Sequence, residues 1–107
     1  MKLGIFLVAA ATLAAQVAEK ANERYQSPDG RQGIAQTLTE PSRDARQKPR
    51  ELVVALGVKP GTTVADLGTG PGYMLPYLSE AVGSQGRVIG QDIFPDFLAK
   101  ARNVLLR

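Results

Sequence analysis

The feature that most constrains this chain is a run of three closely spaced glycines directly after a short apolar segment. Residues 63–67 (TVADL) are β-branched or apolar and lie between glycines, which predicts a buried strand. Gly68, Gly70 and Gly72 then follow at alternate positions, and a helical pattern begins after them. Because glycines carry no side chain, a flat or extended ligand can reach the backbone at the start of that helix. The run therefore predicts an α/β protein with a ligand site at this loop.

The rest of the C-terminal half predicts alternating helices and strands. We expect a helix from Pro49 to a stop at Gly57, a helix at residues 73–82, a strand at residues 87–92 and a last helix from Pro95. This order indicates right-handed β–α units of a parallel sheet. The positions expected to face the core are Leu52, Val53 and Leu56; Met74, Leu75, Leu78 and Val82; and Leu98, Ala101, Val104 and Leu105.

Two carboxylates flank the glycine loop and limit the kind of ligand. Asp92 closes the second strand at the same crevice, where it can accept hydrogen bonds from two ribose hydroxyls. Asp66, just before the loop, would repel a pyrophosphate and attract a cation. The third glycine of a dinucleotide fingerprint would fall at Tyr73, and no Gly-Lys-Ser/Thr of a phosphate loop follows. The site therefore predicts a ligand with a ribose, a positive charge and no phosphate, which S-adenosylmethionine fits.

These residues resemble a known class of enzymes. V-A-D-L-G-T-G-P-G-Y resembles motif I of the class I S-adenosylmethionine-dependent methyltransferases, and V-I-G-Q-D-I resembles their acidic motif II. The stretch from residue 43 to residue 102, with R-D-x-x-Q-K-P, K-P-G-T-T-V and G-R-V-I-G-Q-D, is similar to small bacterial exported methyltransferases of this class. The resemblance implies a Rossmann-like α/β fold with S-adenosyl-L-methionine as methyl donor. Because such a fold has more strands than two, we expect the N-terminal part of a methyltransferase, weak or inactive alone.

The resemblance also implies roles for residues of the loop. Gly68, Gly70 and Gly72 would line the methionine and ribose side of the cosubstrate. Asp66 would orient the loop and the methionine amino group. Tyr73 would contact the methionine end, with packing as its alternative role. The structural alternative for the three glycines is a tight turn that binds no ligand.

Two further residues complete the implied cosubstrate site. Asp92 would hold the 2′- and 3′-hydroxyls of the ribose, and Ile93 would pack on the adenine. The alternative for Asp92 is a cap on the approach to the helix that begins at Pro95, and the alternative for Ile93 is packing. The methyl acceptor and any general base stay unassigned.

Composition excludes several kinds of chemistry and agrees with methyl transfer. The chain has no Cys and no His, which leaves no thiolate or imidazole for a metal site or for nucleophilic catalysis. A sulfonium donor is already activated, so the protein mainly holds donor and acceptor in line. The net charge of +3 is too small to indicate nucleic-acid binding. The competing functions are a nucleotide- or NAD-binding α/β fragment and an exported non-catalytic interaction module.

The N-terminal part predicts export and a polar lead-in. In residues 1–15, Lys2 precedes an apolar run that ends in small residues, which is typical of a secretory signal peptide; an uncleaved anchor and a buried helix are the alternatives. We expect a periplasmic or secreted protein that meets the membrane only through this segment, a lead-in at residues 16–48 and a partial methyltransferase domain at residues 49–107.

Three local expectations complete the sequence-based prediction. The lead-in would hold a short helix at residues 17–25 and a turn at residues 27–31. The basic cluster at residues 43–50 has two readings, a solvated helix start or lead-in loop and, alternatively, a binding patch. A sheet of two parallel strands would leave an open edge and an uncovered apolar face, through which copies of the chain could self-associate.

Overall fold

The computed structural model describes residues 17–105, and the segment predicted to direct export lies outside the described residues. The chain divides into two compact units with their boundary between Ile34 and Ala35. Each unit is described separately. Among the described residues, no helix combines the length and the apolar character that crossing a membrane requires.

The first unit is helical, and one sequence-based prediction for it is wrong. Residues 17–22 are helical and continue into a 3₁₀ turn, η1 (Glu23–Gln26), which confirms the short helix expected there. The segment predicted as a turn is instead the start of helix α2 (Pro28–Leu38). The backbone N–H of Gly30 donates to Ser27 Oγ at 3.1 Å, and Pro28 occupies the first helical turn. Ser-Pro-Asp-Gly here is helix-start chemistry, which uses the same residue types as a turn.

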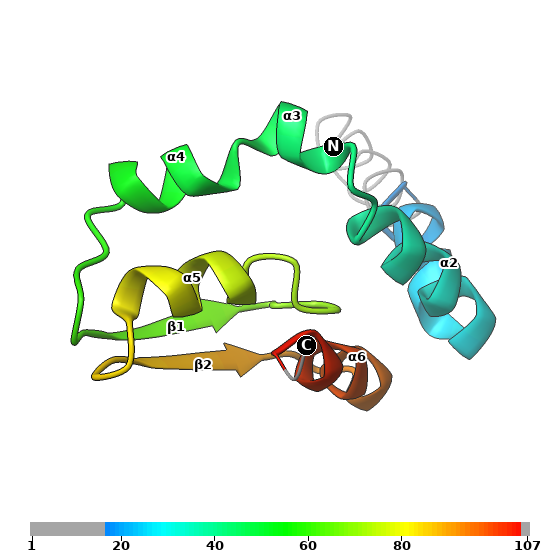
Figure 1. The fold of residues 1–107 in the computed structure, drawn as a ribbon. Coiled ribbons are helices and arrows are strands. Elements are labelled where there is room, and N and C mark those ends of the chain that lie inside the picture. The colour runs from blue at the N-terminus through cyan, green and yellow to red at the C-terminus, as the bar shows by residue number, and fades with distance from the viewer. Residues whose placement is uncertain (1–16, 106–107) are drawn as a thin grey trace, which may run out of the picture. The chain divides into compact units, whose positions relative to one another are not determined.

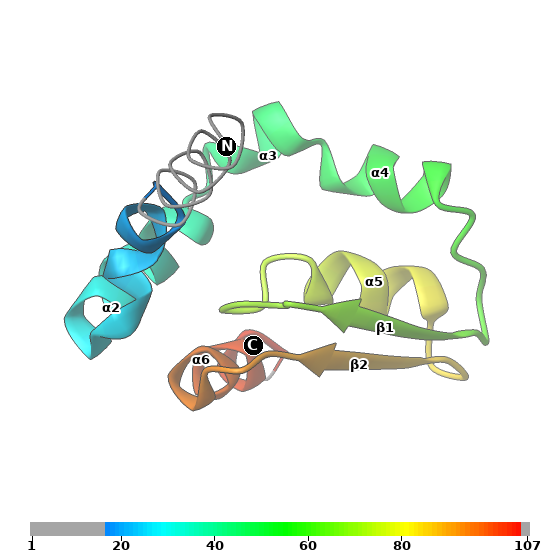
Figure 2. The same ribbon diagram turned by 180° about the vertical axis from the view of Figure 1, so that it is seen from behind.

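The second unit has the predicted α/β architecture. Its helices and strands, in chain order, are α3 (Arg43–Gln47), α4 (Pro49–Ala55), β1 (Thr63–Leu67), α5 (Leu75–Val82), β2 (Arg87–Gln91) and α6 (Pro95–Leu105). β1 and β2 pair in parallel, with Thr63 opposite Arg87 and Leu67 opposite Gln91. α5 connects the two strands and lies over one face of the sheet in both views (Figures 1 and 2).

The core of this unit lies between the sheet and the helices on that face. α5 contacts both strands and also α4 and α6. The buried apolar side chains of the core include Val53 of α4, Leu75, Leu78 and Val82 of α5, and Phe97 and Ala101 of α6. These residues recur at helical spacing on α5 and α6, so burial of one stripe on each helix explains why these segments are helical.

The opposite face of the sheet is uncovered in the described part of the chain. Leu67 of β1 is 77% exposed and Ile89 of β2 is 47% exposed. Side chains alternate between the faces of a strand, so these residues point away from α5. The structure therefore confirms the predicted fold class: an incomplete Rossmann-like arrangement with two parallel strands and flanking helices.

Several predicted core positions are wrong. In α6, Phe97 is 2% exposed, whereas Leu105 is 50% exposed although it continues the i, i+4 row of Phe97 and Ala101. Leu52 of α4 and Leu56, just after it, are 45% and 65% exposed, and only Val53 of the predicted face is buried. A helix of seven residues whose main contact is with α5 has little surface to cover.

The helix after the glycine loop starts later than predicted. α5 begins at Leu75 with Met74 as its N-cap, and Pro76 lies in the first turn, where its missing N–H costs no helical hydrogen bond. Met74 is half-buried rather than part of the core. The glycine loop is therefore longer than the sequence indicates and includes Tyr73.

Candidate cofactor-binding site

The glycine loop crosses the carboxyl end of the sheet. The backbone N–H groups of Gly68 and Thr69 donate to the carbonyl of Gln91, the last residue of β2, at 2.8 and 2.9 Å. Gly68, Gly70 and Gly72 have φ angles of 72°, 57° and 90°, a region that residues with a side chain rarely adopt. The alternate spacing of the glycines is therefore a requirement of this turn, whichever ligand the loop binds.

Asp92 links the loop to the approach of α6. One carboxylate oxygen accepts a hydrogen bond from the Gly70 N–H at 2.8 Å, and the other accepts one from the Phe94 N–H at 3.0 Å. The carboxylate is half-buried. The structure thus brings Asp92 to the loop as the sequence predicts, and it also shows the capping contact that was the alternative. Its role toward a ribose stays a prediction.

Asp66 stabilises the loop from the other strand. Its carboxylate accepts a hydrogen bond from the Thr69 hydroxyl at 2.8 Å, and Thr69 is buried. This contact joins Asp66 to the loop, and the expected roles of Asp66 toward the loop and toward a methionine amino group stay predictions. The carboxylates of Asp66 and Asp92 thus both accept hydrogen bonds from one short loop. Residues 66–73 contain no Lys or Arg. Such a site favours a cationic ligand over a phosphate.

The glycines of the loop face different surroundings. A Cβ on Gly72 would lie 2.9 Å from Ala101 Cα, so the loop packs directly on α6 at this point. A Cβ on Gly68 would meet nothing within 4 Å. The open approach to the backbone is therefore at Gly68, while Gly72 provides close packing. Lining of the cosubstrate by Gly68, Gly70 and Gly72 stays a prediction.

The two remaining predicted residues differ in their surroundings. Ile93 follows Asp92 and is 77% exposed, which leaves an apolar side chain open at the carboxyl end of β2. Tyr73 is half-buried and donates its hydroxyl to Asp44 at 2.7 Å. Contact of Ile93 with an adenine and of Tyr73 with a methionine end both stay predictions.

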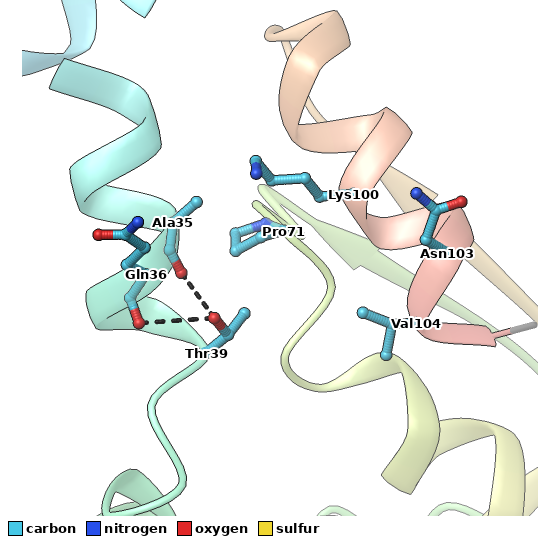
Figure 3. Close-up of a pocket in the computed structure, with 7 residues that line it drawn as sticks. All are labelled: Ala35, Gln36, Thr39, Pro71, Lys100, Asn103 and Val104. Carbon is cyan, nitrogen blue, oxygen red and sulfur yellow. Dashed lines mark hydrogen bonds between the residues drawn. The ribbon is translucent and has the colours of Figure 1, made fainter. Parts of the chain in front are cut away.

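A hollow beside the loop was not predicted from the sequence. It has a volume of about 380 Å³, and Pro71 of the loop forms part of its wall. Figure 3 shows α2 residues on one side and α6 residues on the other. Its lining residues are Ala35, Gln36, Thr39, Pro71, Lys100, Asn103 and Val104. They come from three separate segments, so no local pattern could have indicated them.

The sequence also missed a partner of the loop, Asp44. It lies in the basic cluster, and its carboxylate accepts hydrogen bonds from Tyr73 and, one helical turn further on, from Tyr77. These two hydroxyls, with smaller contributions from Arg50 and Arg43, lower the pKa of Asp44. The available signal was the spacing of the tyrosines, since residues four apart at the start of a predicted helix can reach the same partner.

The site fits the cofactor that the sequence predicts. Asp92 offers a carboxylate at the end of β2, Gly68 leaves the backbone open, and residues 66–73 donate two hydrogen bonds to carboxylates and contain no Lys or Arg. Strand, glycine loop, helix, strand and terminal acid together define the class of S-adenosylmethionine-dependent methyltransferases.

Comparison with known proteins gives the class a family. The sequence profile of the protein-L-isoaspartate(D-aspartate) O-methyltransferase (PCMT) family matches residues 15–107, and the chain belongs to this family. Among solved structures, a SAM-dependent methyltransferase from Aquifex aeolicus is similar at 35% identity and a TM-score of 0.66, over 69% of this chain and 39% of that one.

Curated relatives share shorter stretches. The tRNA (adenine(57)-N(1)/adenine(58)-N(1))-methyltransferase TrmI of Methanocaldococcus jannaschii is 46% identical over 56 residues, which is 52% of this chain and 20% of the relative. The ribosomal RNA large subunit methyltransferase E of Myxococcus xanthus is 58% identical over 36 residues, 34% of this chain and 17% of the relative. The chain thus spans about a fifth of the length of these relatives.

Proposed function

We propose that this chain forms the S-adenosylmethionine-binding part of a methyltransferase. The observation that carries the proposal is the bond between the Asp92 carboxylate and the Gly70 N–H, because it places an acid for ribose hydroxyls against the loop of motif I. Membership of the PCMT family supports it. When bound, S-adenosylmethionine supplies a methyl group on a sulfonium, which is activated without help from the protein.

The residues of the chain would hold the cofactor rather than react with it. Asp92 would accept hydrogen bonds from the ribose through lone pairs that its two backbone donors leave free. Asp66 holds Thr69 and adds negative charge, which favours the sulfonium and the α-amino group. The exposed Ile93 would cover the adenine with apolar surface.

Calorimetric titration with S-adenosylhomocysteine tests the proposal. Wild type should bind, and Asp92→Asn should weaken binding at least about tenfold, because a hydrogen bond to a charged group contributes about 1.5–3 kcal/mol. Asp96→Asn is the matched control, since Asp96 caps the first turn of α6 through the Phe97 N–H and lies outside the proposed site. Binding of NAD in preference to S-adenosylhomocysteine would support the nucleotide-binding alternative, and binding of neither would support the interaction module.

The acceptor we propose is a carboxylate of an isoaspartyl residue. The PCMT profile covers most of the chain. Relatives whose names specify tRNA, ribosomal RNA and arsenite each match only 36–56 residues. Because these relatives act on different acceptors, the shorter similarities do not indicate which acceptor this chain serves. The test measures transfer of radiolabelled methyl groups by a methyltransferase that contains this chain. An isoaspartyl peptide should be labelled, and the matching aspartyl peptide and tRNA should not.

The proposed location is outside the cytoplasm. Lys2 followed by the apolar run in residues 1–15 supports secretion of the chain through a cleaved signal peptide. Fractionation of cells that express the chain, followed by N-terminal sequencing of the exported form, tests this. Retention of Met1 on chains found in the membrane would favour an uncleaved anchor.

A further inference from the structure

Asp44 forms a cluster that joins α3 to the start of α5. Its two carboxylate oxygens accept hydrogen bonds from the hydroxyls of Tyr73 and Tyr77, each at 2.7 Å. The two rings are 5.9 Å apart in an edge-to-face arrangement. One carboxylate thus fixes two neighbouring aromatic side chains, and we call Asp44, Tyr73 and Tyr77 the α3 latch.

Two arginines surround the latch. The guanidinium of Arg43 lies 4.0 Å from the centroid of the Tyr73 ring, and that of Arg50 lies 5.5 Å from the Tyr77 ring. Arg50 also forms an ion pair with Glu80 further along α5. The positive charges of Arg43 and Arg50 help to keep the Asp44 carboxylate ionised, and so able to accept both hydrogen bonds.

The two halves of the latch differ in what lies beyond them. Tyr73 follows Gly72, whose N–H donates to the Thr69 carbonyl at 3.1 Å and whose own carbonyl accepts from the Leu75 N–H at 3.2 Å. Thr69 in turn bonds to Asp66. Tyr77, by contrast, lies within α5, where the helix already fixes the backbone. A hydrogen bond that restrains Tyr73 therefore also restrains the backbone of the glycine loop, whereas one that restrains Tyr77 does not.

We propose that Asp44 is a positioning residue for cofactor binding, which acts through the Tyr73 hydroxyl to fix the end of the glycine loop. The inference rests on the proposed function, because it assigns the loop to S-adenosylmethionine. Asp44 would act without contacting the cofactor. It lowers the number of conformations available to the loop before the ligand arrives, which favours binding.

The test compares Tyr73→Phe with Tyr77→Phe, each of which removes one of the two hydroxyls that donate to the Asp44 carboxylate. Tyr73→Phe should weaken S-adenosylhomocysteine binding at least about fivefold, the lower end of typical coupling between sites, and so should Asp44→Ala, which removes the carboxylate itself. Tyr77→Phe is the matched control and should leave the affinity within about twofold of wild type. Equal loss of affinity in Tyr73→Phe and Tyr77→Phe would show a merely structural contact and overturn the proposal.

Amide hydrogen exchange of the ligand-free chain gives a readout that needs no cofactor. Residues 68–75 should exchange faster in Tyr73→Phe and Asp44→Ala than in wild type, and at the wild-type rate in Tyr77→Phe. If exchange of this loop is unchanged in the first two variants, the latch does not position it and the proposal fails. If wild type binds no S-adenosylhomocysteine while the loop responds as expected, the proposed function fails and the positioning of the loop by Asp44 stands.

If the chain binds S-adenosylhomocysteine, thermodynamic linkage provides a further test of the coupling between the latch and the cofactor site. If the latch favours binding, then binding must favour the latch by the same factor. S-adenosylhomocysteine should therefore slow amide exchange in residues 43–48 of wild type, including the Lys48 N–H that donates to the Asp44 carbonyl. The same ligand should have no such effect in Tyr73→Phe. Slowing in both proteins would contradict the coupling.

Discussion

Single ionisable groups set the pH range in which the α3 latch holds. Partial burial and the hydrogen bond to Asp44 raise the pKa of Tyr73 to about 12 from an ordinary value of 10.0. Tyr77 donates its own hydrogen bond to Asp44, which raises the pKa of Tyr77, and the two tyrosine hydroxyls lower the pKa of Asp44 below its ordinary 3.8. The latch is therefore in its bonded ionisation state throughout the neutral range.

The raised pKa of Tyr73 predicts a loss of stability at alkaline pH. Between pH 10 and pH 12 the unfolded chain loses the Tyr73 proton while the folded chain keeps it. Because the unfolded state then binds fewer protons, the free energy of unfolding falls as pH rises through this window. Urea-unfolding midpoints at pH 9 and pH 11 measure the effect, and the midpoint should drop less in Tyr73→Phe than in wild type. An equal drop in the two proteins would contradict it.

Residue chemistry within one segment could be predicted from the sequence, whereas pairing between segments could not. Asp66, Asp92 and the glycines lie in or beside the loop that they were assigned to, because strand ends and glycine turns place them locally. Asp44 lies 29 residues before Tyr73. The partner of the Asp44 carboxylate depends on how α3 packs, and Asp44 is the one acid in a cluster with four basic residues, so the sequence pattern drew attention to the basic charge.

At the scale of helices, burial separates leucines that look equivalent in the sequence. Leu78 of α5 is 5% exposed, whereas Leu56, after α4, is 65% exposed, although both were predicted to face the core. Leu78→Ala should lower the free energy of unfolding by about 2–5 kcal/mol, because the removed methyl groups leave a cavity. Leu56→Ala should change it by no more than about 0.5 kcal/mol. Thermal or urea unfolding of the two variants checks the contrast, and similar losses would contradict the packing of α5.

The errors at helix level have a common physical origin. The start of α2 was predicted as a turn, since Ser, Pro, Asp and Gly serve both purposes. At Gly30 a Cβ would lie 2.1 Å from the carbonyl oxygen of Arg24 in η1, so the close packing of η1 on the start of α2 requires glycine at this position. In α6, Phe97 and Ala101 are buried, whereas Leu105, four residues further along the same row, is 50% exposed. In both helices the pattern allows more than one solution, and contacts with other segments select among them.

For the whole molecule, the parallel pairing and its uncovered face could be predicted because they follow from element order. A right-handed β–α–β unit puts its helix on one side of the sheet, so a sheet with helices on that side alone leaves the other side bare. The hollow beside Pro71 could not be predicted, since three segments form it. Element order thus determines the layers, and the shape of the surface depends on side chains that meet across them.

The uncovered sheet predicts self-association of this chain. Among the described residues, β1 and β2 form a two-stranded sheet, so each strand has one edge with unpaired backbone groups, and Leu67 and Ile89 add exposed apolar surface beside those edges. Such an edge pairs readily with another chain, and a lysine on an edge strand prevents it. In analytical ultracentrifugation, wild type should show a mass that rises with concentration, and Ile89→Lys should shift it toward the monomer. Leu56→Lys introduces the same charge at an exposed site away from the sheet and should behave as wild type. Equal effects of the two lysines would mean that net charge, rather than the open sheet, controls association.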